Sequence, residues 1–142
     1  MIDVATCSLT SKYTTFAKWN IDHIFIAPPN ASEQTLREIA KSGSGYLYLL
    51  GRAGVTGAEI KANFSLDETL SVLNQYHSAP SLVGFGISEP AQVKHFVSKG
   101  AGGAIGGSAT VAIVERFLQE PKTMHKNLAD FCSAMKAATH PD

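Results

Sequence analysis

The sequence has no excess of charge of either sign. Twelve Lys and Arg residues balance twelve Asp and Glu residues, so the formal net charge over 142 residues is zero. A chain without net positive charge has no general attraction for nucleic acid or for an anionic membrane surface. An anionic ligand would therefore have to be held by local geometry.

The sequence also lacks a long apolar run, a secretory leader and a cysteine framework. It has no stretch of about 18 apolar residues that could span a bilayer. Its first ten residues, MIDVATCSLT, lack the basic region and apolar core of a signal peptide. Cys7 and Cys132 lie far apart, and the five histidines show no metal-ligand spacing. These features predict a cytoplasmic protein with reduced thiols and no bound metal.

Short apolar runs alternate with amphipathic stretches along the chain. The runs show no polar alternation, which is typical of strands buried on both faces of a parallel sheet. They lie at Met1–Val4, Ile24–Ala27, Tyr46–Leu50, Leu82–Phe85 and Gly103–Ile105. Helices are predicted between and after them, at about 8–19, 32–41, 65–77, 88–99, 107–120 and 122–138. This alternation predicts a parallel α/β fold in a single domain.

Several helix ends are marked by capping residues. Ser32 precedes the second predicted helix, and Ser65 with Glu68 forms a capping box for the third. Ser88 is the predicted cap of the fourth helix, with Pro90 in its first turn. Four apolar residues are predicted to point inward from the last helix: Met124, Leu128, Phe131 and Met135.

Two parallel architectures fit this pattern, namely a doubly wound open sheet and a (β/α)8 barrel. Five strand–helix units in 142 residues would fill an open sheet but only part of a barrel, which needs about 250 residues. Length alone therefore favours the open sheet. The motifs at the strand ends favour the barrel.

Three glycine-rich segments follow or overlap predicted strands: Arg52–Glu59 (RAGVTGAE), Gly84–Ser88 (GFGIS) and Gly102–Ser108 (GGAIGGS). Glycine at a strand end lets backbone N–H groups approach an anion, and a helix start adds oriented donors. Each segment alone also fits a tight turn or close strand–helix packing. Two of them on consecutive strands favour a phosphate site, which barrels build after their last two strands. Neither fits GxGxxG or a Walker P-loop, so a nucleotide is not favoured.

Two side chains near these segments have alternative interpretations. Tyr48, on a predicted strand, is either a core aromatic or a wall of the pocket. Asp3, at the end of the first predicted strand, is either functional or a solvated loop residue.

Taken together, five segments resemble the tryptophan synthase α chain in the order and spacing of that family. They are IFIAPPNAS, GYLYLLGRAGVTGAE, YHSAPSLVGFGIS, GAIGGSATVAIVE and FCSAMKAA, and they cover nearly all of residues 21–138. Residues 1–20 match weakly. The resemblance implies a partial (β/α)8 TIM barrel made of about the last five β/α units, with residues 1–142 forming one incomplete domain. Asp3 falls on an acidic position at the end of the family's fourth strand.

The resemblance also implies a reaction and a set of site residues. The family cleaves indole-3-glycerol phosphate to indole and glyceraldehyde 3-phosphate. The positions that match its phosphate site are Gly57, Gly86, Gly107 and Ser108. Tyr48 and Phe85 match positions that wall the indole pocket. Arg52 begins the lid loop, and Thr56 matches the lid threonine that bonds the catalytic aspartate.

The family's catalytic glutamate and aspartate belong to its first three β/α units, so no residue of this sequence is assigned a catalytic role. General acid–base groups contribute about 10²–10⁴-fold each, so little turnover is expected from this chain alone. The α chain needs no cofactor, because pyridoxal phosphate belongs to the partner β chain, which receives indole. Two alternatives stay open: a catalytically inactive module that binds phosphate or the β chain, and another phosphate-binding barrel such as a phosphoribosyl isomerase. The RAGVTGAE segment argues against the second.

Overall fold

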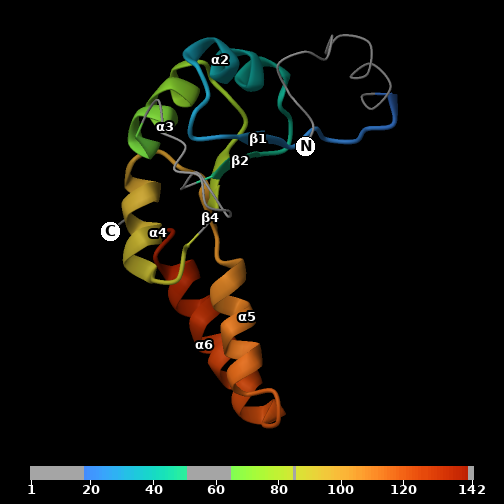
Figure 1. Cartoon of the computed structure of the whole chain (residues 1–142), viewed down its shortest axis with the longest axis vertical. Helices are drawn as coiled ribbons and strands as arrows, with labels where there is room; N and C mark the ends of the chain where they lie inside the picture. The colour runs from blue at the N-terminus through green and yellow to red at the C-terminus, as the bar shows by residue number, and fades with distance from the viewer. Residues whose placement is uncertain (1–17, 51–64, 85, 141–142) are drawn as a thin grey trace.

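The computed structural model describes residues 18–50, 65–84 and 86–140. The elements follow one another as strands and helices in turn, with two helices at the end (Figure 1). The strands are β1 (Phe25–Ala27), β2 (Leu47–Leu50), β3 (Ser81–Gly84) and β4 (Gly103–Ile105). The helices are α2 (Glu33–Ser42), α3 (Leu66–Gln75), α4 (Pro90–Ser98), α5 (Gly107–Arg116) and α6 (Pro121–Ala137). The first predicted strand and most of the first predicted helix lie outside the described residues.

The four strands form one parallel sheet in the order β1-β2-β3-β4. Each connection leaves the carboxyl end of one strand, includes a helix, and returns to start the next strand beside it. This is the strand order of a β/α barrel segment, in which neighbours in sequence are neighbours in the sheet. The predicted parallel α/β fold is confirmed.

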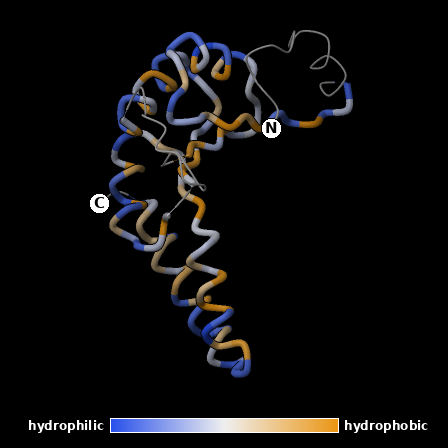
Figure 2. Tube along the Cα trace, in the orientation of Figure 1, coloured by the Kyte–Doolittle hydropathy of each residue, from blue (hydrophilic) through white to orange (hydrophobic). Residues whose placement is uncertain are grey.

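The hydrophobic core lies between the sheet and the helices on one of its faces. Leu47, Leu49 and Val83 are fully buried on the strands, and apolar side chains of α2, α3 and α4 pack in the same cluster. The helix residues of this cluster are Leu36, Ile39, Ala40, Leu70, Leu73 and Val93. In Figure 1, α2, α3 and α4 follow one another around this side of the sheet. Figure 2 shows the outward turns of α2 as hydrophilic.

The predicted caps of α2 and α3 are confirmed. The side chain of Ser32 accepts a hydrogen bond from the Thr35 N–H (3.2 Å). Ser65 and Glu68 form a reciprocal capping box, with the Ser65 N–H donating to the Glu68 carboxylate at 2.6 Å. These bonds satisfy N–H groups that a helix start otherwise leaves without partners.

Ser88 is not the cap of α4. The cap position belongs to Glu89, whose backbone is extended, and Pro90 is the first helical residue. The Gln92 side chain reaches back and accepts hydrogen bonds from the N–H groups of Ser88 (2.9 Å) and Glu89 (3.0 Å). Ser88 therefore donates its own N–H to a glutamine of the helix instead of capping the helix with its hydroxyl.

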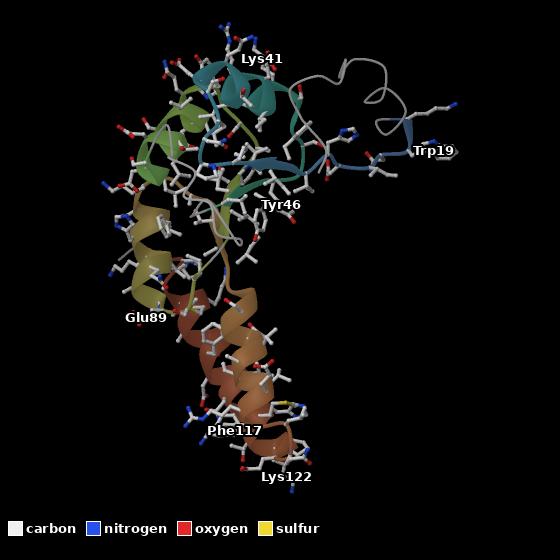
Figure 3. The ribbon with its side chains drawn as sticks, in the orientation of Figure 1. Trp19, Lys41, Tyr46, Glu89, Phe117 and Lys122 are labelled. Carbon is white, nitrogen blue, oxygen red and sulfur yellow. The ribbon has the colours of Figure 1, made fainter. Side chains whose placement is uncertain are left out.

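The last two helices also differ from the sequence prediction. α5 ends at Arg116 and not near Pro121, because residues 117–120 are needed to reverse the chain before Pro121 starts α6. α5 and α6 run side by side and extend away from the sheet (Figure 1), and Phe117 and Lys122 mark their far end (Figure 3).

The predicted inward face of α6 is only partly confirmed. No residue of α6 is fully buried, and of the four apolar residues predicted to point inward only Met135 packs against the main core. Phe131 reaches Gly106 at the end of β4, within 3.5 Å of where a Cβ would stand. The other contacts of α6 are mainly with α5 and α4, which explains why a helical apolar stripe did not translate into burial.

Candidate anion-binding site

The carboxyl ends of β3 and β4 bring two of the glycine-rich segments together. Gly84 pairs with Ile105 at the end of the two strands. Just beyond, a Cβ on Gly106 would stand 3.3 Å from the carbonyl oxygen of Ile87. The GFGIS and IGGS segments are therefore neighbours at one end of the sheet, as their positions on consecutive strands predicted.

The start of α5 is the part of this region best suited to an anion. Its cap residue is Gly106, no side chain among the described residues caps it, and no acidic residue lies in its first turn. The first helical hydrogen bond runs from the Thr110 N–H to the Gly106 carbonyl (3.3 Å). The N–H groups of Gly107 and Ser108 precede that bond, so they belong to the donors that a helix leaves for an external partner. They also lie at the positive end of the helix dipole.

The surroundings of Gly107 and Gly86 are open. Both residues are exposed, and a Cβ added to either would find no heavy atom within 4 Å. Gly86 has a φ of +73°, a conformation that side chains disfavour, so the GFG turn requires glycine there. Ser108 is exposed as well, in the first turn of α5. A ligand can therefore approach the backbone at both segments.

At the start of α4, by contrast, a side chain of the same helix accepts hydrogen bonds from backbone N–H groups. Gln92 accepts from two backbone N–H groups there and donates its Nε2 to the Gly86 carbonyl (3.2 Å). Glu89 adds a carboxylate at this helix start. Among the described residues, a side chain bonds backbone N–H groups at the start of α4, whereas no side chain caps the start of α5. The role of Gln92 was not predicted from the sequence, although its spacing from Glu89 is that of a capping box.

Tyr48 lies against the end of β3. A Cβ on Gly84 would overlap the Tyr48 ring, standing 2.9 Å from Cε2 and closer still to Cζ and the hydroxyl. Tyr48 is partly buried and belongs to the face of the sheet opposite the core helices. The ring therefore lines the region next to the glycine turn, and Gly84 is small because the ring occupies the space of a side chain.

The remaining residues predicted for the site lie outside the described residues. They are Arg52, Thr56, Gly57 and Phe85, together with Asp3. Among the residues that are described, no group of three His, Cys, Asp or Glu side chains could hold a metal ion.

These features define the class of β/α-barrel proteins. The sheet is parallel with helices between its strands, and open glycine turns lie beside a helix start after β3 and β4. Barrels of this class hold their phosphate sites at the ends of such strands. Within that class, the family model for "Tryptophan synthase alpha chain" matches residues 3–140, and the chain belongs to this family.

Curated relatives agree with this assignment. The chain is 53 % identical over 137 residues to the tryptophan synthase alpha chain of Vibrio parahaemolyticus, covering 96 % of this chain and 51 % of the relative. It is 56 % identical over 122 residues to the alpha chain of Vibrio cholerae, covering 86 % of this chain and 46 % of the relative. The chain spans about half the length of these relatives.

Solved structures match in fold. A mutant tryptophan synthase alpha-subunit from Pyrococcus furiosus superposes with a TM-score of 0.68 at 23 % identity, over 88 % of this chain and 49 % of that one. A chain of the tryptophan synthase α2β2 complex from the same organism gives 0.67 at 22 % identity, over 88 % of this chain and 46 % of that one. The fold is thus that of a partial TIM barrel.

Proposed function

We propose that this chain supplies the phosphate-binding part of a tryptophan synthase α-type lyase. The complete barrel would cleave indole-3-glycerol phosphate to indole and glyceraldehyde 3-phosphate by an aldol cleavage. The 142 residues would be the C-terminal part of that single barrel domain. The observation that carries this proposal is the start of α5, where Gly107 and Ser108 are exposed and no described side chain caps the helix.

The phosphate of the substrate fits this position chemically. Backbone N–H donors and the positive end of a helix dipole favour an anion without a charged side chain. The chain has no net positive charge, so this local arrangement is what can attract a phosphate. The Ser108 hydroxyl adds a donor, and the open turn at Gly86 lets the ligand approach the backbone.

The indole end of the substrate would lie beside Tyr48. Its ring already lines the end of the sheet next to Gly84, on the face away from the core helices. Phe85, Arg52, Thr56 and Gly57 remain proposed members of the pocket and its lid. No residue of the chain is proposed as the general acid or base, and no cofactor is proposed for this chain.

A charge placed at the start of α5 tests the phosphate site. Gly107→Glu puts a carboxylate where the phosphate would bind, whereas Gly107→Gln adds a neutral side chain of the same size. A carboxylate in a first helical turn favours the helix by about 0.3–1 kcal/mol, so Gly107→Glu should fold. Calorimetric titration with glycerol 3-phosphate should show binding to the unmodified chain, weaker binding to Gly107→Gln and none to Gly107→Glu. Equal binding by all three would place the anion elsewhere.

The lyase step is tested by indole release from indole-3-glycerol phosphate. We expect no release by the chain alone, and release when the N-terminal half of a relative's α chain is supplied. Release by the chain alone would show that it carries its own acid–base groups. Phosphate binding without release in either case would favour the alternative of an inactive binding module.

The proposed partner is a tryptophan synthase β chain, and the proposed location is the cytoplasm. One matching structure belongs to an α2β2 complex, and none of the helices among the described residues is long and apolar enough to cross a membrane. Co-purification with a tagged β chain tests the partner. Retention of the chain together with the N-terminal half of a relative's α chain would support this partner. Elution of both in the flow-through would contradict it.

A further inference from the structure

Gln92, in the first turn of α4, bonds three backbone groups of the segment that leads into its helix. Its Oε1 accepts hydrogen bonds from the N–H groups of Ser88 (2.9 Å) and Glu89 (3.0 Å). Its Nε2 donates to the carbonyl oxygen of Gly86 (3.2 Å), and the side chain is partly buried. One side-chain amide therefore ties together both ends of residues 86–89, which are called the GISE turn below.

The GISE turn begins at a residue that needs such a restraint. Glycine has a wider choice of backbone conformations than any other residue. Gly86 has a φ of +73°, and a Cβ added to it would meet no heavy atom within 4 Å. Packing on that side therefore does not hold the residue in place. The hydrogen bonds to Gln92 restrict the turn where packing does not.

The GISE turn also contacts the segment that leads into α5. A Cβ on Gly106, the cap residue of α5, would stand 3.3 Å from the carbonyl oxygen of Ile87 in the middle of the turn. The side chain of Ile87 is buried in the core. The turn thus lies directly against the residue that precedes Gly107 and Ser108. A movement of the turn would change the space beside the start of α5.

We propose that Gln92 is a positioning residue for the phosphate site. By tying Gly86 to the start of α4, it keeps Ile87 against Gly106 and so fixes the turn beside the donors of α5. This inference rests on the proposed function, because it assumes that the phosphate binds at the start of α5. A site that is held in place before its ligand arrives loses less conformational freedom on binding. Removing the hydrogen bonds of Gln92 should therefore weaken phosphate binding.

Calorimetric titration of the full chain with glycerol 3-phosphate tests this role. Gln92→Met keeps the length of the side chain but makes none of the three hydrogen bonds, and binding should weaken about tenfold. The matched control is Ser32→Ala, which removes the side-chain cap of α2, a helix that follows β1 and not β3 or β4. It should lower stability and yet leave the dissociation constant within about twofold. Far-UV circular dichroism shows whether each variant is folded.

A second variant separates the turn from the helix cap. Gln92→Glu keeps an oxygen that can accept from the N–H groups of Ser88 and Glu89, as glutamate does in a capping box, but it cannot donate to the Gly86 carbonyl. It should fold with unchanged stability and still bind glycerol 3-phosphate more weakly. Ala91→Glu controls for the added charge, since it places a carboxylate in the same turn and leaves Gln92 in place. Binding by Gln92→Glu should be at least about threefold weaker than binding by Ala91→Glu at physiological salt.

Several outcomes would overturn the proposal. One is an equal dissociation constant for the unmodified chain and folded Gln92→Met. Tighter binding by Gln92→Met is another, since it would show that Gln92 competes with the phosphate for backbone donors. Equal weakening in Ser32→Ala, or in Ala91→Glu and Gln92→Glu alike, would reduce the effect to stability or to charge. If Gln92→Met does not fold, the comparison of Gln92→Glu with Ala91→Glu decides.

The same titrations distinguish this inference from the proposed function. If the unmodified chain does not bind glycerol 3-phosphate, the phosphate site fails and the role of Gln92 fails with it. If the unmodified chain binds and folded Gln92→Met binds equally well, the phosphate site stands and only the role of Gln92 is removed.

Discussion

The contact between Gly84 and Tyr48 makes a quantitative prediction about the end of β3. In Gly84→Ala the new methyl group would overlap the Tyr48 ring, at 2.9 Å from Cε2 and closer to the hydroxyl end. The backbone of β3 is paired on both sides, to β2 and β4, so the ring has to move and not the strand. Overpacking of this kind costs about 1–3 kcal/mol. We expect Gly84→Ala to lose a free energy of unfolding in that range.

A double-mutant cycle isolates the contact. In a Tyr48→Leu background the ring is absent, so adding the methyl group to residue 84 should cost less than about 0.5 kcal/mol. Urea unfolding followed by far-UV circular dichroism measures all four free energies. The control is Gly107→Ala, where the added Cβ meets no atom within 4 Å and where alanine favours the helix by about 0.5–1 kcal/mol.

Two results would refute this reasoning. An equal loss of stability in both backgrounds would show that the glycine is required by its backbone and not by the ring. No loss in either background would show that the ring leaves Gly84 easily. In the second case Tyr48 would not be a fixed wall of the proposed pocket.

Gly86→Ala should lose about 1–2 kcal/mol although its Cβ has space, because φ is +73° there; urea unfolding checks this, and an unchanged midpoint would show that the turn relaxes. Leu70→Ala should lose about 2–5 kcal/mol in the same assay, since Leu70 is fully buried, and a loss below 1 kcal/mol would contradict a packed core. Ser65→Ala should lose about 0.5–2 kcal/mol. The hydrogen bonds from Ser65 lower the pKa of Glu68 below its usual 4.5. The capping box therefore stabilises the fold above that pH, and its contribution is lost as the pH falls through the lowered value. Glu68→Gln, which removes the charged acceptor of the Ser65 N–H, should therefore lose stability at neutral pH and lose less in acid, and a constant difference from neutral to acid pH would contradict this linkage.

Much of the architecture could be predicted from local patterns. The apolar runs located all four described strands, with Gly103–Ile105 found to the residue, because strands buried in a parallel sheet need continuous apolar segments. The Ser65–Glu68 capping box fixed the start of α3, since both of its hydrogen bonds are made within four residues. The five family segments indicated a family that the comparison over residues 3–140 confirmed.

Tertiary structure decided the features that depend on distant neighbours. The sequence could not show that Phe131 of α6 reaches Gly106 at the end of β4, because the two residues lie 25 positions apart. It could not show that Gly84 yields its space to Tyr48, since the two lie 36 positions apart and meet only when β2 pairs with β3. The apolar stripe of α6 predicted the partly buried face of the helix but not that none of its residues would be fully buried, because a stripe specifies a face but not the surface that will cover it. Hydrogen bonds made within one helical turn can be predicted from the local sequence. Burial and close approach depend on which strands and helices pack together.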